Sequence, residues 1–129
     1  MNLMPLANLL EDGGVGTKGT TIFLDMMPAE ADSAILLRTP LRGSKIDYEL
    51  PGYFKTEYQL IIRTPSSLYD DAMSLTDQVI ATLTLTNAQV ENHYYTYSRP
   101  RTEAIVFPLS KGNLLEFNVM FDCCFVKTP

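Results

Sequence analysis

The sequence has no tryptophan, one histidine and two cysteines, and the cysteines, Cys123 and Cys124, are neighbours. Side chains of consecutive strand residues point to opposite faces, so a disulfide bond between these two would need severe distortion. We therefore expect two free thiols, buried or half-buried, in a reducing compartment. A metal site needs several ligands, and one histidine with a single adjacent cysteine pair provides too few, so the sequence predicts no metal and no other cofactor.

Long apolar runs and an excess of positive charge are also missing. No apolar run approaches the roughly 20 residues that cross a bilayer, and residues 1–5 lack the features of a signal peptide. We expect a soluble cytoplasmic protein without membrane contact. Ten Lys and Arg against fifteen Asp and Glu give a net charge of −5. Modules that bind phosphate groups usually have the opposite sign, so general nucleic-acid affinity is not expected.

The length of 129 residues, with 46% hydrophobic residues, predicts a single domain spanning residues 1–129 with a substantial core. Two segments have the spacing of amphipathic helices. Residues 3–12 form the first, with Asn2 as a cap and Pro5 in the first turn. The second, of about four turns, follows Pro65, and Ser67 with Asp70 resembles a capping box. Its apolar residues recur at steps of three and four: Leu68, Ala72, Leu75, Val79 and Leu83.

Six segments have the composition or alternation of strands. They cover residues 20–26, 34–39, 57–63, 89–98, 103–107 and the stretch after Asn113. The last segment alternates most strongly, with Leu115, Phe117 and each second residue to Phe125 on one face. We expect residues 41–56 to be a loop or a weak hairpin arm. Strands clustered around two helices favour an α+β fold, a mostly antiparallel sheet with the long helix packed on it.

Gly14, Gly16 and Gly19 match the letters of a dinucleotide-binding motif, but a helix precedes them and a strand follows. This order is opposite to that of the motif, so a flexible loop is expected. His93 could form a nucleophilic pair with Cys123 or Cys124 if their strands are adjacent. Nothing in the local sequence supports such a site, so a surface or interface histidine is favoured and an enzyme is not.

Residues 94–101 interleave tyrosine with arginine, a pattern that can stack on bases. Three tyrosines on one strand cover both of its faces, so at least one face meets the core or another protein. Because the chain is acidic, protein contact is favoured over a nucleic-acid site.

The order of these elements resembles the tail terminator, or minor capsid and tail-completion, proteins of long-tailed bacteriophages. The features that carry the resemblance are the short first helix and its glycine-rich joint, residues 20–24, Met26-Met27-Pro28, the short strand over residues 34–38, residues 47–53, and residues 59–63 before the long helix. The aromatic strand and the long last strand complete the pattern. The resemblance covers most of the chain.

The resemblance implies a structural virion protein that forms a homo-hexameric ring on the tail tube, ends tube polymerisation and provides the surface that joins the head. Its partners would be further copies of itself, the tail-tube protein and a head-completion or connector protein. DNA would pass through the ring without specific binding, and assembly would occur in the host bacterial cytoplasm. The loops at residues 13–19 and 41–56 are suited to becoming ordered on assembly.

We expect the protein interface to include Tyr48, Tyr53, Phe54, His93, Tyr95, Tyr97, Arg99 and Arg101. Three alternatives remain open at this point. The chain could be another neck, connector or tail-tube protein, a small cytoplasmic enzyme that uses His93 and a cysteine, or a single-strand nucleic-acid binder that uses residues 94–101.

Overall fold

The structure, a computed structural model, describes residues 1–39, 53–109 and 112–128. The elements are α1 (Met4–Asp12), β1 (Ile22–Leu24), β2 (Ala34–Arg38), β3 (Tyr53–Pro65), a 3-10 turn (Ser66–Leu68), α2 (Tyr69–Leu83), β4 (Leu85–Val90), β5 (His93–Pro100), β6 (Ile105–Leu109) and β7 (Leu114–Lys127). The strands form one sheet in the order β1-β2-β3-β7-β5-β4, and β6 pairs with β7. Only the β1–β2 pair is parallel among the described strands. The expected α+β fold with a mostly antiparallel sheet is confirmed.

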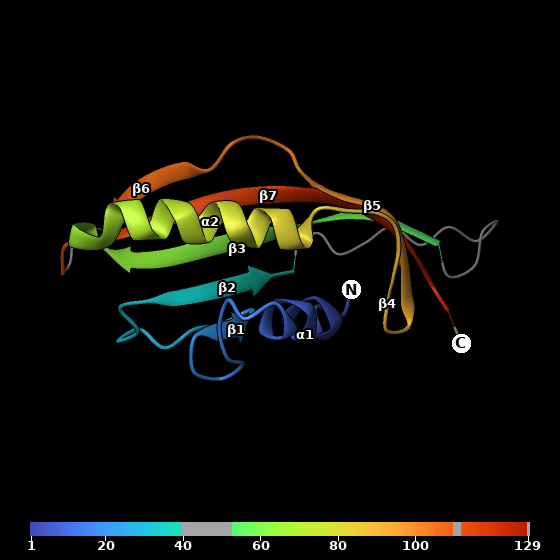
Figure 1. Cartoon of the computed structure of the whole chain (residues 1–129), viewed down its shortest axis with the longest axis horizontal. Coiled ribbons are helices and arrows are strands. Elements are labelled where there is room, and N and C mark those ends of the chain that lie inside the picture. Colours follow the sequence, from blue (N-terminus) through green and yellow to red (C-terminus); the bar gives the residue numbers. More distant parts are fainter. Residues whose placement is uncertain (40–52, 110–111, 129) are drawn as a thin grey trace.

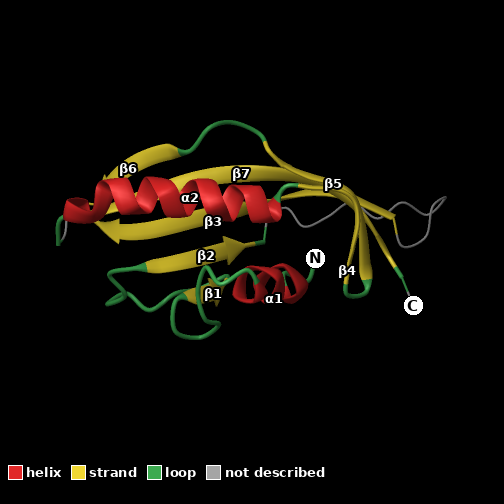
Figure 2. Cartoon of the chain, in the orientation of Figure 1, coloured by secondary structure: helices red, strands yellow, loops and turns green. Residues whose placement is uncertain are grey.

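Both helices lie on one face of the sheet, where the core forms (Figures 1 and 2). Alternate side chains of the long central strands β3 and β7 point toward the helices. From β3 these are Tyr58, Leu60 and Ile62, and from β7 they are Phe117, Val119, Phe121, Cys123 and Phe125, all at most 1% exposed. Burial of each large apolar side chain contributes about 1.5–3 kcal/mol, so this shared face dominates stability. The alternation predicted for the last strand is confirmed.

Helix α1 begins as its sequence predicts. The side-chain oxygen of Asn2 accepts a hydrogen bond from the backbone N–H of Met4 at 2.9 Å, and Pro5 occupies the first turn. Leu6, Ala7 and Leu10 are fully buried against the core. Gly14, with φ of 78°, turns the chain away after the helix, a backbone conformation that glycine adopts without strain.

The start of α2 differs from the predicted capping box. Residues 66–68 form a 3-10 turn, so Ser67 lies inside this turn and no side chain caps α2. Asp70 and Asp71 do occupy the first turn of α2, where negative charge favours the helix dipole. The apolar stripe is confirmed for Ala72, Val79 and Leu83, which are buried. It is wrong for Leu68, which is 44% exposed because it lies in the 3-10 turn before α2.

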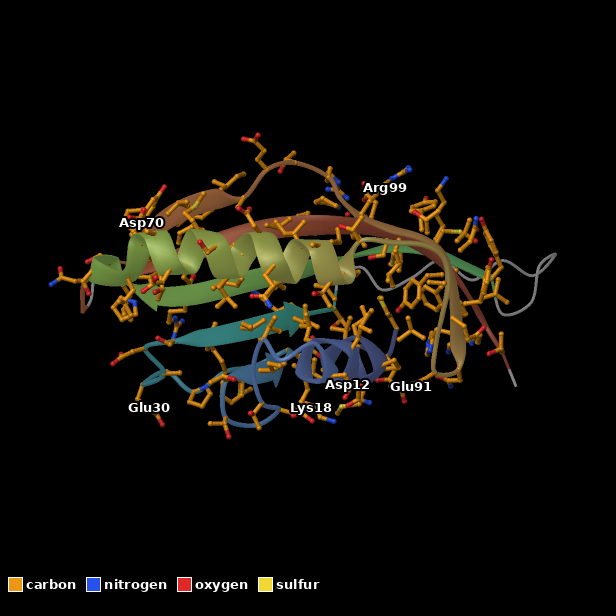
Figure 3. All side chains as sticks on the ribbon, in the orientation of Figure 1. Asp12, Lys18, Glu30, Asp70, Glu91 and Arg99 are labelled. Atoms are coloured by element: carbon orange, nitrogen blue, oxygen red, sulfur yellow. The ribbon has the colours of Figure 1, made fainter. Side chains whose placement is uncertain are left out.

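The segment expected as a single strand over residues 89–98 is a hairpin, which raises the strand count from six to seven. β4 and β5 are joined by a turn in which Glu91 has φ of 52°. The Glu91 carboxylate accepts a hydrogen bond from the side-chain amide of Asn8 at 2.8 Å, and Figure 3 shows the labelled Glu91 side chain at the hairpin, beside α1. This contact ties the hairpin to α1, and Figure 1 shows the hairpin curling away from the rest of the sheet toward that helix.

Three further boundaries differ from expectation. β1 has only three residues because the carbonyl oxygen of Thr17 accepts hydrogen bonds from the N–H groups of Thr20, Thr21 and Ile22, which holds residues 17–21 in a compact turn. These hydrogen bonds organise the end of the loop at residues 13–19, and further ordering of that loop on assembly stays a prediction. β3 begins at Tyr53, so the last four residues of the expected loop at 41–56 are strand, and residues 41–52 lie outside the described part. β6 extends through Pro108 to Leu109.

Candidate protein-interaction surface

Most of the residues expected at an interface lie at the start of β3 and along β5, and both segments pair with the end of β7. Tyr48 lies outside the described residues. Tyr53 and Phe54 start β3, and the register places them opposite Val126 and Phe125 of β7. The same stretch of β7 pairs with β5 on its other side. The structure thus brings most of the predicted residues together, but it divides them between the two faces of the sheet.

An aromatic cluster occupies the helix-covered face of this region. The rings of Phe54 and Phe125 stack with their centroids 5.2 Å apart, and the Lys127 ammonium lies 4.9 Å from the centroid of Phe54. His93 and Tyr95 lie 5.1 and 5.5 Å from Phe125 by ring centroids. The cluster extends the core to the curled end of the sheet.

His93 is 1% exposed and Tyr95 is fully buried, so the expectation of a surface histidine is wrong. Among the described residues, neither ring nitrogen of His93 has a hydrogen-bond partner, and the same holds for the Tyr95 hydroxyl. Burial lowers the pKa of His93, and the positive charge of Lys127 lowers it further. Burial also raises the pKa of Tyr95. Both residues belong to the core of the isolated chain.

A β-bulge in β5 explains why neighbouring residues of that strand have different roles. The register with β7 shifts between Tyr95 and Tyr97, so Thr96 is an extra residue. Without the shift, Tyr97 would follow His93 and Tyr95 into the core. With it, Ser98 is buried while Tyr97 and Arg99 face outward. The Arg99 guanidinium lies 4.2 Å from the centre of the Tyr97 ring, a cation–π contact.

Arg101 is exposed and forms ion pairs with two carboxylates on the central strands. Its Nη2 atom donates to Asp122 of β7 at 2.6 Å and to Glu57 of β3. These hydrogen bonds, first that to Asp122, raise the pKa of Arg101. Further along the same two strands and on the same face, Arg63 of β3 donates through Nε and Nη2 to Glu116 of β7, at 3.1 and 2.9 Å. The helix-free face therefore neutralises its central cations internally.

The possible cysteine–histidine pair does not form. In the sheet register Cys124 lies opposite Tyr97 and Cys123 opposite Ser98, whereas His93 lies opposite Lys127. Along β7 the two cysteines are three and four residues from Lys127, a separation of roughly 10–13 Å. Burial raises the pKa of the Cys123 thiol to about 12, and the Cys124 thiol donates to the Tyr53 hydroxyl at 2.8 Å. A protonated, buried thiol is a poor nucleophile.

The sequence interpretation missed the apolar surface around β6. Ile105 and Phe107 are 53% and 49% exposed, and their register partners Asn118 and Glu116 place them on the helix-free face. On the opposite face, Tyr69 and Met73 of α2 are also exposed, and the Tyr69 ring lies 5.7 Å from that of Phe117, the β7 partner of Val106. The run Ile-Val-Phe marks a strand, but it does not reveal which of its faces stays uncovered.

Described residues thus present side-chain surfaces suited to protein contact, and the histidine and thiols on which the enzyme alternative depends are buried apart from one another. A family model for bacteriophage tail terminator protein matches residues 9–123. The chain belongs to the bacteriophage tail terminator family, which confirms the resemblance. This family comprises structural proteins of the virion tail and is not an enzyme class.

The fold also has a counterpart among solved structures. A chain from the virion of a native gene transfer agent (GTA) particle superposes with a TM-score of 0.61 at 14% sequence identity, and the match covers 94% of this chain and 84% of that chain. At this identity the similarity shows the fold alone. Comparison with curated proteins gives no match. No helix within the described residues is long and apolar enough to span a membrane.

Proposed function

We propose that this protein assembles into a closed ring, a hexamer by analogy with the family, that binds the end of the phage tail tube. The bound ring stops tube polymerisation and provides the surface to which the head joins. Its partners are further copies of the chain, the tail-tube protein and a head-completion or connector protein, and assembly takes place in the host bacterial cytoplasm. The family match over residues 9–123 carries this proposal.

The distribution of charge supports passage of DNA without specific binding. Helices α1 and α2 contain five carboxylates and no lysine or arginine: Glu11, Asp12, Asp70, Asp71 and Asp77. The remaining ten carboxylates equal the ten Lys and Arg in number, so the net charge of −5 resides on the helical layer. The cations at the centre of the helix-free face are paired with carboxylates. The acidic helical layer therefore repels a polyanion, and these paired cations offer little net positive charge to hold one.

Mass measurement in solution, followed by electron microscopy of the purified protein, tests the proposal. A terminator should give single rings, or monomers that become single rings once tail-tube ends are added. A tail-tube subunit would instead stack into filaments, because its ring surfaces recruit further rings. Filaments of the purified protein would therefore overturn the proposal in favour of a tube subunit.

A further inference from the structure

The edge strand β6 leaves two large apolar side chains exposed, which we call the β6 ridge and define as Ile105 and Phe107. They are two of the eight large apolar side chains that are exposed in the described part of the chain. Both lie on the helix-free face of the sheet, opposite Asn118 and Glu116 of β7. Neighbouring exposed apolar side chains of this kind mark an interaction site.

A pocket of about 390 Å³ lies at the same end of the sheet, on the other side of its central strands. We call it the β2 pocket. Its walls come from the loop after α1, from β2 and β3, and from α2, and its apolar lining includes Val15, Ile35, Ile62, Leu68 and Leu75. A cavity of roughly 150 Å³ already accepts a benzene ring, so this pocket has room for an aromatic side chain with a neighbour. Asp71 stands at its wall.

The ridge and the pocket lie at opposite edges of one half of the sheet. At this end the strands run in the order β6-β7-β3-β2-β1. Figure 1 shows β6 along one side of the molecule and the loop after α1 along the other. An apolar projection that matches a pocket elsewhere on the same molecule produces head-to-tail contacts, which close into a ring when the rotation permits.

We propose that the β6 ridge of one copy inserts into the β2 pocket of the next copy. This inference rests on the proposed ring and names its subunit contact. A second copy is the occupant because the same molecule carries both an exposed apolar pair, Ile105 and Phe107, and an apolar pocket with room for it.

Side chains, rather than added strand pairing, carry this contact. Pro108 lacks an N–H group within β6, and proline on an edge strand opposes pairing with another strand. The edge of β1 is occupied by its own loop, since Gly19 N–H donates to the carbonyl of Ile22 at 2.9 Å. β4 ends beside α1, at the Asn8–Glu91 hydrogen bond.

Mixing two variants tests the head-to-tail geometry. The ridge variant carries Ile105→Ser and Phe107→Ser, and the pocket variant carries Leu68→Lys. All three residues are at least 44% exposed, so both variants should fold. Each alone should self-associate at least about tenfold more weakly than the natural chain, because each loses burial of large apolar groups. An equimolar mixture should form dimers and nothing larger, since only one functional ridge–pocket contact is available per pair. Met26→Ser, at a residue 79% exposed and remote from both surfaces, is the matched control.

Disulfide cross-linking of assembled rings is a second test of the ridge–pocket contact. A chain with Phe107→Cys and Leu68→Cys should oxidise into a covalent ladder of copies, whereas Phe107→Cys with Met26→Cys should not. The natural cysteines are buried and do not interfere. Rings that survive in both variants, without a ladder, would overturn this contact while leaving the proposed function intact. A natural chain that neither forms rings nor binds tube ends would instead overturn the proposed function.

Discussion

The hydroxyl oxygens of Tyr58 and Ser98 lie 2.7 Å apart in the core, although their strands, β3 and β5, are separated by β7. Both side chains are fully buried, and the Tyr58 ring stacks on Phe121 with centroids 5.0 Å apart. Burial raises the pKa of Tyr58 well above its ordinary value, so its hydroxyl remains protonated, and either hydroxyl can donate. This hydrogen bond holds the start of the curled hairpin against the centre of the sheet.

Removal of either hydroxyl should therefore destabilise the fold. Tyr58→Phe leaves the Ser98 hydroxyl buried without a partner, and Ser98→Ala leaves that of Tyr58, so each should cost about 1–3 kcal/mol. The double variant loses both polar groups and should cost less than the sum of the two. Urea unfolding of all four proteins measures this coupling. Strictly additive losses would mean that the hydroxyl groups do not interact.

His93 should make stability depend on pH. Its pKa is lowered in the folded protein from an unfolded value near 6.5, so the unfolded chain takes up a proton first as the pH falls. The His93 contribution is fully present above the unfolded pKa and is lost as the pH falls through 6.5 toward the folded pKa, with a slope of at most about 1.4 kcal/mol per pH unit. Urea midpoints between pH 8 and 5 measure it.

The matched variant for this prediction is His93→Phe, which keeps an aromatic ring in the cluster. The chain has no other histidine, so the variant should show a flat profile from pH 8 to about pH 5.5. An equally steep loss in both proteins over this range would assign the effect to another group.

Arg101 should contribute modestly to the free energy of unfolding, and this contribution should decrease as the salt concentration rises. Arg101→Ala leaves Glu57 and Asp122, which are register partners on β3 and β7, facing each other without a cation. Because all three side chains are exposed to solvent, the expected loss is only about 0.5–1 kcal/mol at low ionic strength and smaller in 1 M salt. Lys55→Ala, at an exposed lysine of β3, the strand that carries Glu57, should have little effect on stability at either salt concentration. A loss for Arg101→Ala that is independent of salt would contradict this account.

The two thiols should be unreactive until the protein unfolds. Cys123 and Cys124 are at most 1% exposed, and the pKa of Cys123 is raised to about 12. A thiol-labelling reagent should modify neither cysteine rapidly in the native protein and both in urea, since only the exposed thiolate reacts quickly. Rapid labelling of one thiol in the native state would indicate an activated cysteine and would revive the enzyme alternative.

Sequence patterns predicted the helices and strands that bury one face and leave the other exposed. β7 alternates along its length and α2 repeats at three and four residues, so their buried faces followed from periodicity alone. The turn between β4 and β5 escaped detection because it contains neither glycine nor proline, and Glu91 adopts a positive φ there. Serine is a residue type that often caps a helix. Ser67 instead lies inside a 3-10 turn, because β3 ends at Pro65 and the turn begins directly after it.

The candidate surface was less predictable than the fold for a specific physical reason. Alternation along residues 93–99 assigns faces only while the register is regular, and the bulge at Thr96 inverts every assignment after Tyr95. Exposure of Ile105 and Phe107 depends on which face of the sheet the helices leave open, and no local pattern contains that information.

Addition of the purified protein to growing tail tubes tests the central claim most directly. Tubes assembled from the tail-tube protein should stop elongating once the chain is added, and a gold-labelled chain should appear at one end of each tube as a single ring. The Met26→Ser control should behave identically. Continued elongation, or label distributed along the tube wall, would contradict the assignment of this protein to tube termination.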